Sequence, residues 1–126
     1  VDTLRHLGLI FLAGGAGTLA RYGVSSGMYA LFGRSFPWGT IAVNLIGCFL
    51  FGLVWELAAV RLLIKDLSKE IILVGFMGSF TTFSTFIFDS HVLWRSGSAF
   101  GMACNLFVQI VTGFLALRAG MLLASY

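Results

Sequence analysis

Four long apolar runs, separated by short polar segments, make up most of the chain. They cover residues 4–32, 38–61, 70–94 and 98–124. Each run reaches the roughly 20 residues that an α-helix needs to cross a hydrocarbon core about 30 Å thick. The connections are too short to hold a second domain. The pattern therefore predicts one all-α integral membrane domain of four transmembrane helices over residues 1–126.

Composition supports the membrane assignment. The chain is 59% hydrophobic and only 10% charged, whereas soluble domains are about 25% charged. Its 16 glycines also fit, since glycine is commoner in membrane helices than in soluble ones. The net charge of +3 is spread over short connections, so no basic run indicates a nucleic-acid partner.

The first run has an alternative reading as a cleaved signal peptide. Arg5 precedes an apolar stretch, and small residues follow at 13–17. We favour a membrane helix because the helical pattern continues to Phe32 and no hydrophilic mature domain follows.

Lysine and arginine near the ends of the runs give a weak orientation signal. If the helices alternate in direction, one side carries Arg5, Arg61, Lys65 and Lys69, and the other carries Arg34 and Arg95. The positive-inside rule counts these residues, and four against two is a shallow bias. We expect such a chain to insert in both orientations.

The third run contains the unusual stretch GFMGSFTTFSTF at residues 75–86. Its glycines weaken a helix, and Ser79, Thr81 and Thr82 can cap a restarted one. We therefore expect this helix to break between residues 78 and 82, near the middle of the membrane. A break offers carbonyls to a cation and a helix amino terminus to an anion. The alternative is a continuous helix whose hydroxyls bond to their own preceding turn.

Phe83 and Phe86 are three residues apart, so they share one face of the restarted helix. An aromatic pair at this spacing usually packs in a core. Ser84 and Thr85 come between these two residues in the sequence and add hydroxyl groups, which is unusual for core packing.

Polar side chains also lie inside the other runs. The second run contains Asn44, whose amide needs partners because an unpaired polar group is costly in an apolar setting. It either clamps two helices together or faces a polar path. In the fourth run, Asn105, Gln109 and Thr112 form a polar stripe at helical spacing. Arg21 is the ionised residue deep in the first run, and intramembrane charges are candidates for function.

These residues do not predict an enzyme. No carboxylate lies at mid-depth in a run, no Cys/His cluster has metal-ligand spacing, and no nucleophile has an evident base. Polar stripes on three helices instead suggest a narrow polar path through the membrane.

Three motifs together resemble the Fluc/CrcB family of fluoride channels. They are GGAGTLARY (14–22), PWGTIAVNLIGCFLFG (37–52) and GFMGSFTTFSTF (75–86). The resemblance extends over the whole chain, in length, number of spans and motif order. It implies a multi-pass protein of the plasma (inner) membrane of a prokaryote that exports fluoride passively.

The resemblance also implies an assembly and a set of site residues. Family members form antiparallel dimers, here a homodimer or a pair with an inverted paralogue, with two pores along the interface. Asn44 would lie on the ion path, and Phe83 and Phe86 would face the ion with their ring edges. The carbonyls of Gly78 and Thr81 would hold a structural sodium ion at the dimer centre.

The complete set of expected path residues adds donors from the other stripes. Fluoride is small and tightly hydrated, so passage needs donors that replace water, and amides, hydroxyls and aromatic edges provide them. The chain departs from the family pattern at Ser79, where glycine is frequent, and at Gln109, where smaller hydroxyl residues are frequent. The expected path residues are Arg21, Asn44, Phe83, Ser84, Thr85, Phe86, Asn105, Gln109 and Thr112.

Two other functions compete with a channel. A small proton-coupled cation or drug exporter also has four helices, but it needs a carboxylate at mid-membrane, and Glu56 lies too near the end of its run. An accessory membrane subunit would leave the polar stripes unexplained.

Overall fold

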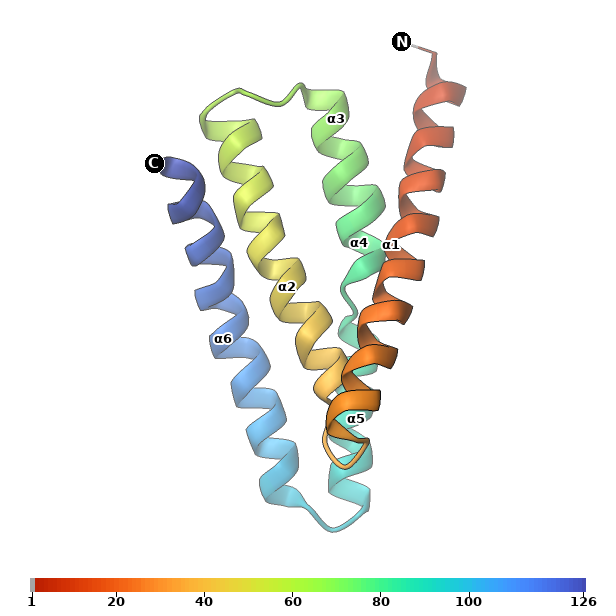
Figure 1. Ribbon diagram of the computed structural model, residues 1–126, viewed down its shortest axis with the longest axis vertical. Coiled ribbons are helices and arrows are strands. Elements are labelled where there is room, and N and C mark those ends of the chain that lie inside the picture. Colours follow the sequence, from red (N-terminus) through yellow and green to blue (C-terminus); the bar gives the residue numbers. More distant parts are fainter. Residues whose placement is uncertain (1) are drawn as a thin grey trace.

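The computed structural model describes residues 2–126 as eight helical segments arranged in four long rods (Figure 1). Both termini and the α2–α3 connection lie at one end, and the other two turns lie at the opposite end. In chain order the segments are α1 (Thr3–Phe32), α2 (Trp38–Trp55), the π-helical turn η1 (Glu56–Val60), α3 (Asp66–Glu70), the π-helical segment η2 (Ile71–Met77), α4 (Gly78–Phe80), α5 (Phe83–Arg95) and α6 (Ala99–Ser125).

The four rods confirm the predicted all-α membrane architecture. The segments Thr3–Phe32, Trp38–Val60, Asp66–Arg95 and Ala99–Ser125 are each long and apolar enough to cross a membrane. Most ends fall within two residues of the predicted ones. The third rod begins earlier than expected because polar residues 66–70 form α3, with an acidic first turn and a basic last turn that suit the helix dipole.

Glycines turn the chain at the end opposite the termini. Gly33 (φ 80°) ends α1, and Gly97 (φ 89°) lies between α5 and α6. Both adopt a left-handed backbone that residues with a Cβ rarely enter. The Gly33 N–H donates to the Tyr29 carbonyl at 2.9 Å and so caps the last turn of α1.

Glycines also let α2 and α6 approach until their backbones touch. A Cβ at Gly52 would collide with the Leu117 carbonyl, and a Cβ at Gly120 would collide with the Phe49 carbonyl. Close approach through small residues is the usual way in which membrane helices pack. We call this contact, formed by residues 49–53 and 117–120, the glycine seam.

The GGAG motif packs α1 against the third rod in a similar way. A Cβ at Gly17 would meet both the Phe76 carbonyl and Ser79 Oγ. On the opposite side of the same contact, a Cβ at Gly75 would lie 3.0 Å from the Ile10 carbonyl. Part of the first motif therefore serves packing.

The third rod is interrupted between α4 and α5. The backbone is extended at Thr81 (φ −83°, ψ 159°) and Thr82 (φ −148°, ψ 114°). This is the C-terminal end of the stretch in which we expected a break, and Gly78 itself remains helical. Thr82 caps the restarted helix, because its Oγ1 accepts a hydrogen bond from the Thr85 N–H at 3.2 Å.

The other two candidate capping residues bond to the preceding turn instead. Ser79 Oγ donates to the Gly75 carbonyl at 2.9 Å, and Thr81 Oγ1 donates to the Met77 carbonyl at 3.0 Å. For these two hydroxyls the alternative reading, bonding within their own helix, is the observed one.

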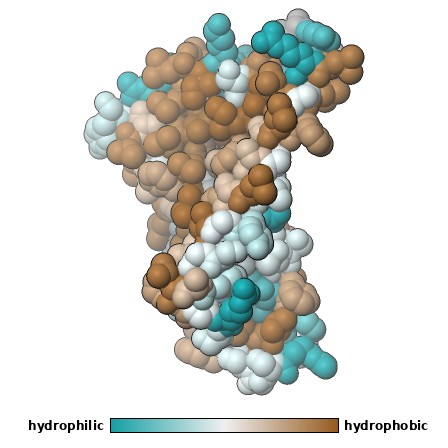
Figure 2. Space-filling view, turned by 45° about the vertical axis from the view of Figure 1, so that its right-hand side comes forward, coloured by the Kyte–Doolittle hydropathy of each residue, from teal (hydrophilic) through white to brown (hydrophobic). Residues whose placement is uncertain are grey.

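The surface of the single chain is strongly apolar. Figure 2 shows apolar residues gathered over the upper half of one face, with hydrophilic residues at both ends. Large apolar side chains such as Phe11 and Leu19 are exposed. Such a surface suits lipid in place of water.

Candidate functional site: an amide-lined groove

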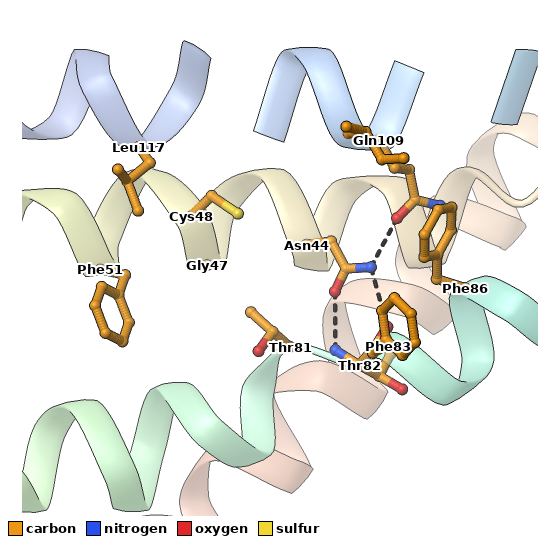
Figure 3. Close-up of a pocket in the computed structure, with 11 residues that line it drawn as sticks. Asn44, Gly47, Cys48, Phe51, Thr81, Thr82, Phe83, Phe86, Gln109 and Leu117 are labelled. Atoms are coloured by element: carbon orange, nitrogen blue, oxygen red, sulfur yellow. Dashed lines mark hydrogen bonds between the residues drawn. The ribbon is translucent and has the colours of Figure 1, made fainter. Parts of the chain in front are cut away.

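A groove of about 440 Å³ opens between α2, α5 and α6, beside the interruption. Its polar part is lined by Asn44 of α2, Gln109 of α6 and the two threonines of the interruption, Thr81 and Thr82. Its remaining walls are apolar and include Phe51, Phe83, Phe86, Ile110 and Leu117. Figure 3 shows the polar groups converging on Asn44. We call this feature the amide groove.

The Asn44 side chain binds both backbone groups of Thr82, its N–H and its carbonyl. The Thr82 N–H donates to Asn44 Oδ1 at 2.8 Å, and Asn44 Nδ2 donates to the Thr82 carbonyl at 3.1 Å. Asn44 Nδ2 also donates to Gln109 Oε1 at 2.7 Å. The first bond takes the place of the helical bond that the Thr82 N–H would make to the Gly78 carbonyl in a continuous helix. All three bonds are drawn in Figure 3. Asn44 therefore does act as an interhelical clamp, and it does so on the wall of the groove.

The hydrogen bonds continue from Gln109 into the interior. Gln109 Nε2 donates to Asn105 Oδ1 at 2.9 Å, and Asn105 Nδ2 donates to Ser90 Oγ at 2.9 Å. Ser90 Oγ in turn donates to the Phe86 carbonyl at 2.9 Å. Asn105 is completely buried, which is tolerable only because both ends of its amide are paired. We call Asn44, Gln109, Asn105 and Ser90 the amide chain.

The clamp and the cap leave two carbonyls without their usual helical donors. In a continuous helix, the carbonyl of one residue accepts from the N–H four residues later. For Gly78 that N–H belongs to Thr82, which donates to Asn44. For Thr81 it belongs to Thr85, which donates to Thr82 Oγ1. These are the two carbonyls expected to bind sodium.

The phenylalanine pair combines one buried and one exposed ring. The ring centroids of Phe83 and Phe86 are 5.8 Å apart, in an edge-to-face arrangement at 67°. Phe86 is 6% exposed and Phe83 is 74% exposed. Both line the groove, so the sequence spacing correctly placed them together, but only Phe86 has a core environment in the single chain.

Arg21 lies in a neighbouring polar pocket of about 330 Å³ and does not line the amide groove. Thr40 and Thr85 line this second pocket, and Thr82 lines both spaces. The two spaces therefore share a wall at the interruption. A fixed positive charge with several hydroxyls is a suitable environment for an anion.

Besides the two residues of the second pocket and the buried Asn105, two more expected path residues lie away from the groove. Thr112 Oγ1 donates to the Val108 carbonyl of its own helix, and Ser84 is exposed on α5. Neither lines the amide groove. The polar stripe of α6 thus divides into Asn105 and Gln109, which pair across helices, and Thr112, which does not.

Ser90 and the contact of Asp89 with Thr40 were not predicted from the sequence. Thr40 Oγ1 donates to Asp89 Oδ2 at 2.6 Å, between α2 and α5. Ser90 lies one turn after Phe86, and that spacing was a usable signal for a polar neighbour of the ring. Nothing in the sequence identified Asn105 as its partner.

The residues suited to a metal ion are carbonyl donors. Within residues 2–126, no group of three or more His, Cys, Asp or Glu side chains lies close enough together to hold one. The two carbonyls freed at the interruption are hard oxygen ligands, which suit a cation such as sodium. Two carbonyls from one chain are too few for a complete site, but a second copy would double them.

Known proteins resemble the chain along almost its whole length. The profile of the family described as CrcB-like protein, Camphor Resistance (CrcB), matches residues 8–121. The chain is 53% identical over 120 residues to the fluoride-specific ion channel FluC of Solidesulfovibrio magneticus, covering 95% of this chain and 96% of that protein. It is 47% identical over 116 residues to the protein of the same name from Nitrosococcus oceani, covering 92% and 93%. For that of Geobacter sulfurreducens the identity is 40% over 115 residues, covering 91% and 93%.

Proposed function

The chain belongs to the CrcB-like family, and on that premise we propose that it is a fluoride-selective channel. It spans the plasma membrane of a bacterium with four helices and lets cytoplasmic fluoride leave the cell passively. The observation that carries this proposal is the amide groove, which joins N–H and hydroxyl donors to an edge-to-face phenylalanine pair.

The chemistry of the groove suits a small anion. Amide N–H groups and hydroxyls replace the water that fluoride loses, and aromatic edges carry partial positive charge. Among the described residues that line the groove, none is charged. Conduction needs binding weak enough to release the ion, and neutral donors meet this requirement. Arg21, in the adjoining pocket, attracts the anion towards the path without trapping it there.

The open side of the groove supports an antiparallel homodimer or a pair with an inverted paralogue. Polar groups that face lipid are costly, so the amides and hydroxyls of the groove need a cover. A second copy, inserted upside down, provides one, and the weak charge bias of the sequence allows both orientations. With one groove in each copy, the dimer has two paths.

A structural sodium ion at the dimer centre is supported by the freed carbonyls of Gly78 and Thr81. Gly78 lies exposed on the single chain, where a second copy could bring its own pair of carbonyls. The ion would neutralise the carbonyl dipoles and hold the two interruptions together.

A proton-coupled exporter is the weaker candidate. Its mechanism needs a carboxylate that exchanges a proton for a cation within the membrane. The amide groove contains no acidic side chain among its described lining residues, and the Asp89 carboxylate lies in a separate pocket that Arg34 also lines. The groove therefore favours an anion.

Fluoride efflux from liposomes tests the proposed function. Purified protein is reconstituted in liposomes loaded with potassium fluoride, and an ion-selective electrode records release after valinomycin is added. We expect rapid fluoride release, and slow chloride release from matched liposomes loaded with potassium chloride. No fluoride release, or proton-coupled uptake of a cationic drug, would contradict the proposal.

A further inference from the structure

The backbone N–H and carbonyl of Thr82 determine which way each amide of the amide chain is turned, that is, where its oxygen and its nitrogen lie. A backbone N–H only donates and a carbonyl only accepts. The Asn44 atom that faces the Thr82 N–H is therefore the oxygen, and the atom that faces the Thr82 carbonyl is the nitrogen. Both N–H groups of Asn44 are then engaged, one with Thr82 and one with Gln109.

The same polarity passes to Gln109. Because Asn44 offers it a donor, Gln109 turns its oxygen towards Asn44 and its nitrogen towards Asn105. One N–H of Gln109 donates to Asn105, and the second donates to no other described residue. Gln109 is 7% exposed and lines the groove beside Phe86, as Figure 3 shows.

The interior end of the chain holds this orientation in place. Asn105 Oδ1 accepts from Gln109 only while Asn105 Nδ2 has its own acceptor, Ser90 Oγ. Ser90 is 4% exposed and its hydroxyl is committed to the Phe86 carbonyl. The bonds therefore all run in one direction, from the clamp to α5.

We propose that the spare N–H of Gln109 is the amide donor that the groove presents to the anion, and that Asn44, Asn105 and Ser90 are positioning residues that aim it. The proposal rests on the proposed function in taking the anion to be fluoride. It assigns Asn44 an indirect role on the path, because its donors are already used. It also gives Ser90 a role in conduction although Ser90 lies outside the groove.

Gln109 is the only glutamine in the sequence, so the proposal can be tested at one atom. Protein labelled with 15N in the glutamine side chain has a single pair of amide proton resonances, one for each N–H of Gln109. In the parent protein, titration with sodium fluoride should shift one resonance of the pair much more than the other, and sodium chloride should shift neither. A pair that ignores fluoride would overturn the role of Gln109 as donor.

Ser90→Ala tests the positioning residues. It should shift the Gln109 resonances, although no hydrogen bond joins Ser90 to Gln109. It should also lower fluoride flux about tenfold, as expected when a buried chain of hydrogen bonds loses a member. The half-saturating fluoride concentration should rise. Ser90→Thr keeps a hydroxyl and should restore both signals, while Ser68→Ala, on the exposed helix α3, should change nothing.

A double-mutant cycle separates positioning from packing. Because Ser90 acts through Gln109, Ser90→Ala should have no further effect on flux in a Gln109→Met background. Additive effects, or Gln109 resonances that are unchanged in Ser90→Ala, would overturn the relay. A parent protein that conducts no fluoride, but whose Gln109 resonances shift in Ser90→Ala, would refute the proposed function and support the relay.

Discussion

The glycine seam and the interruption hold helices together in opposite ways. At the seam, Gly52 and Gly120 have no side chains, and backbone lies against backbone. At the interruption, the side chains of Asn44 and Thr82 replace backbone hydrogen bonds that the helix has lost. The first contact leaves no room for a ligand, while the second leaves carbonyls and an amide N–H without partners. Groups that can bind an ion are therefore present at the interruption, where side chains replace backbone hydrogen bonds, and absent from the seam.

Gly120→Val should have the largest effect, because it attacks the seam directly. A Cβ at Gly120 collides with the Phe49 carbonyl, and backbone cannot move aside as a flexible side chain does. We expect a loss of more than about 3 kcal/mol in the free energy of unfolding, at or beyond the upper end for overpacked sites. Gly15→Val is the matched control, since a Cβ at Gly15 meets nothing within 4 Å. Thermal unfolding in detergent measures both, and equal melting temperatures would show that the seam is not rigid.

Gly78→Val should distinguish the stability of the single chain from the stability of the dimer. A Cβ at Gly78 has only ordinary contact, 3.8 Å from the Leu73 carbonyl, so the fold of one chain should tolerate it. If Gly78 meets a second copy and a sodium ion, the dissociation constant of the dimer should rise at least tenfold in the variant, a change of about 1.4 kcal/mol. Size-exclusion chromatography with light scattering reports the change, and an unaltered dimer would place Gly78 away from the interface.

Asn44→Asp should keep the acceptor for the Thr82 N–H and lose both donors. The new oxygen faces the Thr82 carbonyl and Gln109 Oε1, and its charge repels an anion in the groove. A like charge about 4 Å away costs roughly 4 kcal/mol at an effective dielectric constant of 20. Fluoride flux should therefore fall at least tenfold while the protein stays folded. Unchanged efflux would remove Asn44 from any role in conduction.

Isoleucine in place of each phenylalanine should separate packing from conduction. Volume is nearly conserved, so Phe83→Ile and Phe86→Ile should each cost less than about 1.5 kcal/mol of stability. Both remove an aromatic edge from the groove, so both should lower fluoride flux. Phe86→Ala should cost about 3–5 kcal/mol because its ring is buried, whereas the exposed Phe83 should tolerate alanine in the single chain. Isoleucine variants that conduct like the parent would return these rings to packing alone.

Thr82→Val should have the smallest effect on stability. It removes the cap of α5, which is typically worth about 1 kcal/mol. It leaves in place the hydrogen bonds between Asn44 and the backbone of residue 82. Thr82→Ser retains the cap oxygen and serves as the control. The difference between the two melting temperatures measures the cap, and valine and serine variants of equal stability would show that the clamp alone holds the restart.

The amino-acid sequence by itself determined the four helices and their approximate ends. Length and hydropathy are local properties, and lipid imposes the same demand on every span. It also determined that the chain breaks in its third span and that Phe83 and Phe86 share a face, because capping residues and helical spacing act within a few residues.

Only the tertiary structure decided which polar groups meet. Asn44 and Thr82 are 38 residues apart, and Asn44 and Gln109 are 65 apart, so no local pattern links them. The three polar residues of the fourth span looked equivalent in sequence, yet Asn105 and Gln109 pair across helices while Thr112 bonds to its own. The physical reason is that each amide has to find both a donor and an acceptor, and the packing of four helices selects the partners that lie within reach.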